Sequence, residues 1–188
     1  SFNLNDDFTV KRSNYSDVVN FIVTELDSIV ADLPDTWDAA DFGRVTKGAD
    51  LALKSEILLY AASKLHNPTM DQSKWQAAAD AAKAVIDLNQ YSLVPVNSFK
   101  DYTGIFLNSS NPEIILARPY DPVVLPSNWV DLYNTPNGYG GWGGQCPTQQ
   151  FVDKFQMVNG KNISDPSSGD DPQNPYVGRE PRFYSEIV

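Results

Sequence analysis

The distribution of proline along the 188-residue chain constrains its fold more than any other sequence feature. Three of the 13 prolines lie in residues 1–111, and the other ten lie in residues 112–188. Five of the 11 glycines fall within residues 138–144. Because proline and glycine interrupt helices and strands, the first part of the chain can form long helices, whereas the second part must consist mainly of loops and short elements.

The first part contains four segments in which apolar residues recur at steps of three and four, as in an amphipathic helix. The spacing predicts helices over residues 16–33, 46–65, 73–88 and 98–106. Thr46, Ser73 and Ser98 are suitable N-cap residues, and Gln76, three residues after Ser73, completes a capping-box pattern. The second and third helices are rich in alanine, which lets helix axes approach closely, so we expect them to pair as an antiparallel αα-hairpin.

The second part contains only short candidate elements. Residues 113–118 and 182–188 have the length and the β-branched or aromatic content of strands. Thr148 can cap one short helix over residues 149–157. We therefore expect one mainly α domain over residues 1–188, with a helical part, residues 1–111, and a loop-rich part, residues 112–188, that contains short strands and one short helix.

The composition argues against several classes of function. Fourteen lysines and arginines against 24 aspartates and glutamates give a formal net charge of −10, which opposes binding to nucleic-acid backbones. One histidine, His66, and one cysteine, Cys146, allow neither a His-based catalytic triad nor a multi-histidine metal site. No apolar stretch reaches the length of about 18 residues that a membrane-spanning helix needs. We expect no metal, no cofactor and no enzymatic activity.

The most unusual segment is the long loop predicted over residues 119–146, and loops of this length are often functional. No lysine or arginine occurs between Pro119 and Asp153, so the loop lacks the lysine of a phosphate-binding loop. Flat aromatic rings beside uncharged amides suit the apolar faces and hydroxyl rims of sugars. The candidate glycan-binding residues are Trp142, Tyr139, Trp129, Tyr133, Asn128 and Asn137.

The same aromatic rings have an alternative use, which is to anchor a long loop onto the helices, since tyrosine and tryptophan are good packing residues with a polar end. The glycines around Tyr139 and Trp142 give these large side chains few neighbours to pack against. We therefore expect at least one of the two rings to be exposed to a ligand.

Six motifs follow one another in a recognisable order. They are residues 43–63, which include GRVTKGA and LLYAAS, residues 75–86 with their alanines, residues 91–93 (YSL), residues 111–115 (NPEII), residues 147–149 (PTQ) and residues 179–184 (REPRFY). In this order they resemble the SusD/RagB family of outer-membrane nutrient-binding lipoproteins. Glu180 stands where the family has aspartate, a departure that keeps the charge.

The resemblance implies an α-helical fold with tetratricopeptide-like helix pairs. It also implies a non-catalytic role in capturing an oligosaccharide or other nutrient at the surface of the outer membrane for a SusC-type, TonB-dependent porin. Family members are longer than this chain, so we expect a fragment that lacks the early helices, the lipid-anchored N-terminus and the C-terminal part. Membrane attachment is then through the lipid anchor alone.

Two other functions remain open at this point. The chain could be a structural or interaction module that docks the transporter, with no ligand site of its own. A glycoside-cleaving enzyme is the less favoured possibility, because such enzymes need two carboxylates at a set separation, and a chain with 24 acidic residues always offers some pair.

Overall fold

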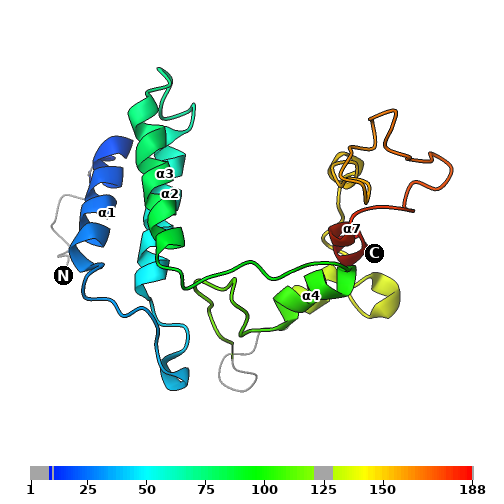
Figure 1. The fold of residues 1–188 in the computed structure, drawn as a ribbon, viewed down its shortest axis with the longest axis horizontal. Coiled ribbons are helices and arrows are strands. Elements are labelled where there is room, and N and C mark those ends of the chain that lie inside the picture. The colour runs from blue at the N-terminus through cyan, green and yellow to red at the C-terminus, as the bar shows by residue number, and fades with distance from the viewer. Residues whose placement is uncertain (1–8, 10, 121–128, 188) are drawn as a thin grey trace. The chain divides into compact units, whose positions relative to one another are not determined.

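The computed structural model describes residues 9, 11–120 and 129–187, which form helices joined by loops (Figure 1). The chain divides into two compact units, Ser1–Ser92 and Leu93–Val188. The first contains α1 (Tyr15–Ile29), the 3-10 helix η1 (Ala39–Asp41), α2 (Lys47–Ala62) and α3 (Gln72–Asp87). The second contains α4 (Phe99–Leu107), α5 (Trp129–Asn134), η2 (Asn137–Tyr139), α6 (Gln149–Val152) and α7 (Pro181–Glu186). None of the described helices is long and apolar enough to cross a membrane.

In the first unit α1, α2 and α3 lie side by side (Figure 1). Tyr15, at the start of α1, stacks on His66, just beyond the end of α2, with ring centroids 3.6 Å apart. Asp27, near the other end of α1, forms an ion pair with Lys54 in the first half of α2. These contacts make α1 antiparallel to α2, and α3 returns along α2 in turn. The mainly α fold and the predicted αα-hairpin are therefore confirmed, with five buried alanines on α2 and α3: Ala49, Ala61, Ala62, Ala78 and Ala81.

Three of the predicted helix caps are confirmed and one is wrong. The hydroxyls of Thr46, Ser98 and Thr148 accept first-turn amide hydrogen bonds at 3.3, 3.2 and 3.3 Å and cap α2, α4 and α6. The cap of α3 is Asp71, whose carboxylate accepts hydrogen bonds from the amide and the hydroxyl of Ser73 at 2.9 and 2.8 Å. A carboxylate is the stronger acceptor and is also favoured by the helix dipole, so α3 begins at Gln72.

Asp50, in the first turn of α2, is a buried acidic group without a hydrogen-bond partner. Its residue is 2% exposed, and no described group donates to either carboxylate oxygen. Burial raises its pKa, the nearby charge of Asp27 raises it further, and the ammonium of Lys54 opposes both. The folded state thus binds a proton that the unfolded chain releases at the ordinary, lower pKa of aspartate, so Asp50 costs stability as the pH rises above that lower value.

Replacing Asp50 with alanine is expected to raise the free energy of unfolding at neutral pH by about 1 kcal/mol, because the change removes a desolvated carboxylate and adds a better helix former. The gain should shrink as the pH falls through the ordinary aspartate pKa of about 3.9, because well below this value the carboxyl is protonated in both states. Urea unfolding followed by circular dichroism at the two pH values measures both effects. Asp80→Ala, on the exposed face of α3, is the control, and a destabilised Asp50→Ala protein would contradict the interpretation.

In the second unit the two predicted strands are absent from the described residues, where an isolated bridge between Met157 and Arg179 is the sole β pairing. Residues 113–118 begin in a turn, because the Asn111 side chain accepts a hydrogen bond from the Glu113 amide at 2.9 Å. Such local side-chain bonds compete with strand pairing. Residues 181–186 form α7 instead of a strand, since Pro181 at the first helical position has its φ preset for a helix.

Residues 112–188 contain three short α-helices in their described part, α5, α6 and α7, where the sequence predicted one. α5 lies inside the predicted loop and is too short to show a helical periodicity. α6 ends at Val152, although its helix was expected to continue to about residue 157. The guanidinium of Arg179 donates hydrogen bonds to the carbonyls of Val152 and Phe155 at 3.0 and 2.7 Å. These carbonyls therefore have partners without a further turn of helix.

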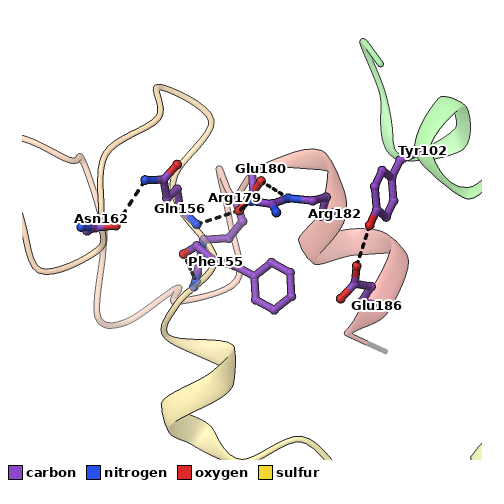
Figure 2. Close-up of polar contacts among 8 residues, drawn as sticks. All are labelled: Tyr102, Phe155, Gln156, Asn162, Arg179, Glu180, Arg182 and Glu186. Carbon is purple, nitrogen blue, oxygen red and sulfur yellow. Dashed lines mark hydrogen bonds and ion pairs between the residues drawn. The ribbon is translucent and has the colours of Figure 1, made fainter. Parts of the chain in front are cut away.

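Arg179 is the centre of the second unit (Figure 2). It is 3% exposed, donates to a third carbonyl, that of Pro175, at 2.8 Å, and lies with its guanidinium carbon 4.6 Å from the ring centroid of Phe183. Phe183 packs in turn against Phe155 and Val152 to form the apolar core. A charged side chain thus satisfies the carbonyls that surround this core.

Glu180, which follows Arg179 in the sequence, is paired with Arg182 (Figure 2). Glu180 accepts the amide of Gln156 at 3.1 Å and two hydrogen bonds from Arg182, each at 2.7 Å. Burial tends to raise the pKa of Glu180, but the hydrogen bonds from Arg182 and from the Gln156 amide outweigh it and hold the pKa below its ordinary value. Residues 179–182 therefore have a structural role. This role needs a carboxylate at position 180, which glutamate supplies as well as aspartate does.

Candidate functional site

The glycine-rich segment folds into an ordered turn that doubles back against the end of α5. The amides of residues 142, 143 and 144 donate to the carbonyls of residues 132, 135 and 133 at 2.8, 3.0 and 2.8 Å. Gly140 has a φ of +86°, a conformation that glycine adopts without strain. Gly141 is buried, and a Cβ atom at this position would overlap the carbonyl oxygen of Thr135. Glycine thus lets the two halves of the turn pack closely.

Three of the predicted site residues meet in one aromatic cluster, which consists of Trp129 and Tyr133 on α5 and Trp142 on the turn. Their ring centroids lie 6.0, 6.2 and 5.2 Å apart. Trp142 meets each of the other two rings edge to face, with interplanar angles of 63° and 84°. The rings hold one another in place, and yet they are 58%, 43% and 53% exposed, respectively. The cluster is therefore both a packing unit and an accessible aromatic surface.

Tyr139 and Asn137 lie on the same turn but have different surroundings. Tyr139, at the end of η2, is 86% exposed, which confirms the expectation that at least one of Tyr139 and Trp142 is accessible. The amide nitrogen of Asn137, in the orientation that satisfies its neighbours, donates to the carbonyls of Gly141 and Trp142 at 2.8 and 3.2 Å. Asn137 thus stabilises the turn. Asn128, the remaining candidate, lies outside the described residues.

The chemistry that this surface offers is stacking and hydrogen bonding. Asp131 is the one charged residue on α5, and the segment between Pro119 and Asp153 has no basic residue. Among the described residues, no three histidine, cysteine, aspartate or glutamate side chains lie close enough together to hold a metal ion. Exposed ring faces with a weakly charged rim suit the C–H faces of an uncharged, hydroxyl-rich ligand.

A groove of about 770 Å³ begins where the turn ends. Asn134 and Gln145 line one part of it, Cys146 lies beside them, and Phe151 of α6 and Glu186 of α7 complete it. Gly143 and Gly144, which directly follow Trp142, also line the groove, so the aromatic cluster and the groove adjoin. Phe151 and Glu186 were not among the predicted site residues, because nothing in their own sequence context connects α6 and α7 with the aromatic loop.

Comparison with known proteins identifies similar sequences and structures. Residues 107–188 match the SusD family. The chain is similar over 98% of its length to the crystal structure of a SusD-like protein from Bacteroides fragilis NCTC 9343, with 29% identity and a TM-score of 0.71. It is also similar over 94% of its length to a SusD-like carbohydrate binding protein from the same organism, with 21% identity and a TM-score of 0.71. No match was found among curated proteins.

The chain spans 36% and 32% of the lengths of these two proteins. The second likeness, at low identity, bears on the fold alone. The first agrees with the family match in the C-terminal part and extends the same fold over the helical part. The resemblance to the SusD/RagB family is therefore confirmed: residues 107–188 carry the SusD family sequence pattern, and the chain has a SusD-like helical fold.

Proposed function

We propose that the chain is part of a non-catalytic carbohydrate-binding protein and that its aromatic cluster, with Tyr139, contacts the glycan. The observation that carries this proposal is that the Trp129, Tyr133 and Trp142 rings are fixed by edge contacts while about half of each ring is exposed. Fixed rings lose little conformational entropy on binding, which favours affinity.

The wider role follows from the family resemblance. The protein captures an oligosaccharide at the surface of the outer membrane and delivers it to a SusC-type, TonB-dependent porin. A lipid anchor provides the membrane attachment. The chemistry of the aromatic surface supports the capture step, whereas the porin and the location are supported by the SusD family match.

Trp142→Ala is expected to weaken glycan binding by about 10- to 100-fold. Truncation of a central aromatic residue removes its stacking contact and typically costs about 2 kcal/mol or more of binding free energy. Tyr139→Ala should weaken it less, since Tyr139 has no ring neighbour among the described residues to hold it in place. Affinity electrophoresis in gels that contain neutral polysaccharides, followed by calorimetry with the best ligand, measures both changes.

Tyr60→Ala is a matched control, since Tyr60 is a similarly accessible tyrosine, 62% exposed, on α2 in the first unit. It should bind as the wild-type protein does. Wild-type affinity in both Trp142→Ala and Tyr139→Ala would show that the glycan binds elsewhere. Release of reducing ends from the same polysaccharides by the purified protein would contradict the non-catalytic assignment.

The interaction-module alternative has one observation in its favour, which is an apolar surface on α4, where Phe106 and Leu107 are 72% and 81% exposed. Co-purification with the porin distinguishes the two functions. A docking module would lose the porin in Phe106→Ser and would bind no polysaccharide, whereas a glycan-binding protein binds polysaccharide in both the wild-type and the Phe106→Ser form.

A further inference from the structure

We propose that the groove lined by Asn134, Gln145, Cys146, Phe151 and Glu186 is a second sugar subsite, which takes an uncharged unit of the glycan whose neighbouring unit stacks on the aromatic cluster. This inference rests on the proposed function, since it extends the same ligand from one surface to the next. It adds residues from α6 and α7 to a site otherwise built from α5 and the turn.

The first argument is continuity and size. The backbone of the turn is fixed against α5 through residues 142–144, so the position of Trp142 relative to the first groove residues, Gly143 and Gly144, is also fixed. A volume of about 770 Å³ lies within the usual range of about 300–1,000 Å³ for small-ligand sites. A linear oligosaccharide that stacks on Trp142 therefore has an adjoining cavity into which its next unit fits.

The second argument is the set of polar groups that the groove presents. Among the described residues, the Asn134 and Gln145 side chains make no hydrogen bond within the protein, so both amides are available as donors and acceptors for sugar hydroxyls. The carboxylate of Glu186 accepts one hydrogen bond, from the hydroxyl of Tyr102 at 3.0 Å (Figure 2). Its second oxygen has no described donor, and it can accept a hydroxyl from a sugar. The ring of Phe151 gives the same groove an apolar wall.

The third argument concerns charge. Glu186 is the one ionisable carboxylate among the groove residues, and no lysine or arginine lines the groove. Lys154 and Arg182 line a separate, smaller depression that shares Glu186, and Arg182 is already paired with Glu180 at 2.7 Å. A uronic acid or a sulfated sugar in the groove would meet the like charge of Glu186 in a groove that has no lysine or arginine in its own lining, which is unfavourable. The groove therefore selects an uncharged sugar unit.

The test is a length series. Cello-, xylo-, manno- and malto-oligosaccharides, from disaccharide to hexasaccharide, are titrated into the wild-type protein and into Gln145→Ala and Glu186→Gln. We expect affinity to rise with length in the wild type and the longest ligand to bind about tenfold more weakly to each variant, because Gln145→Ala removes an amide hydrogen-bonding group and Glu186→Gln replaces a charged acceptor with a weaker neutral one. Trp142→Ala should weaken every length. Gln173→Ala, an exposed glutamine in the loop between α6 and α7, is the matched control.

Cys146 supplies an independent readout, because it is the only cysteine of the chain, is exposed and lines the groove. A bound hexasaccharide should slow the reaction of Cys146 with Ellman's reagent, and a disaccharide should slow it less. Oligogalacturonides and their methyl esters, which differ in charge and by one methyl group on each esterified unit, test the third argument, and we expect the esters to bind more tightly.

Equal affinities of the wild type, Gln145→Ala and Glu186→Gln across the series, with a Cys146 thiol that stays fully reactive, would overturn the groove proposal and leave the role of the aromatic cluster intact. Tighter binding of the free oligogalacturonides than of their esters would overturn the selection for an uncharged unit. If the wild-type protein binds no member of any series, the proposed function fails and the subsite fails with it.

Discussion

Replacement of Arg179 by alanine is expected to lower the free energy of unfolding of the second unit by about 3–5 kcal/mol, the usual cost of removing one partner from a buried charged network. The guanidinium donates to three carbonyls, those of Pro175, Val152 and Phe155. Alanine would leave these acceptors without a donor and would open a cavity against Phe183. Urea unfolding followed by tryptophan fluorescence reports on this unit through Trp129 and Trp142.

Arg182→Ala is the matched control, because the Arg182 side chain is half exposed and pairs with a single residue, Glu180. Because the Arg182 side of this pair is open to solvent, its loss should cost about 1 kcal/mol, much less than the loss of Arg179. Arg179→Lys separates charge from geometry, since lysine keeps the charge but cannot donate to three carbonyls from one planar group. A fully stable Arg179→Lys protein would show that charge alone holds the segments together. Equal losses of unfolding free energy in Arg179→Ala and Arg182→Ala would show that Arg179 is no more important to the second unit than Arg182.

Gly141→Ala is expected to destabilise the second unit by about 1–3 kcal/mol, the usual range for overpacking, and to weaken glycan binding by about tenfold or more. The new methyl group would overlap the Thr135 carbonyl, so the turn must open and Trp142 must move away from α5. No ring is removed, and the loss of affinity therefore reports on the arrangement of the aromatic cluster. The same fluorescence and calorimetry experiments measure both effects.

Gly138→Ala is a close control for this change, because Gly138 lies three residues earlier on the same turn and a Cβ atom there would meet nothing within 4 Å. Its stability should stay the same or rise by a few tenths of a kcal/mol, since alanine restricts the unfolded chain. Its glycan affinity should equal that of the wild type. Loss of binding in Gly138→Ala, or wild-type binding in Gly141→Ala, would show that ligand binding does not depend on the close packing of the turn.

The helices of the first unit could be predicted from the sequence because their signals are local. The steps of three and four give the apolar faces, and Thr46 marks a start that the structure confirms. The cap of α3 lies two residues before the predicted one, since Asp71 accepts hydrogen bonds from the amide and the hydroxyl of Ser73. Competition between neighbouring acceptors is decided by geometry, which composition and spacing do not contain.

The second unit could be predicted less well because its determinants are far apart in the sequence. Residues 182–188 have the composition of a strand, yet Pro181 and the absence of a pairing partner among the described residues make a helix of residues 181–186. The end of α6 depends on Arg179, which lies 27 residues after Val152. The exposure of at least one of Tyr139 and Trp142 was predictable from their glycine neighbours, whereas the groove residues Phe151 and Glu186 come from elements with no local signal for a site.

Gly178 and Glu180, on either side of Arg179 in the sequence, close the base of a long loop, residues 158–178. At its base the Val158 amide donates to the Gly178 carbonyl at 2.8 Å, and the Glu180 amide donates to the Gln156 carbonyl at 3.0 Å. Inside it, Asp165 and Asp171 stabilise separate turns through their own neighbours. Chain length between the two anchor points is thus free to vary at little thermodynamic cost, since doubling a loop costs only about 0.6 kcal/mol. We expect an epitope or a fluorescent reporter inserted between these turns to leave the aromatic cluster of the proposed glycan site intact.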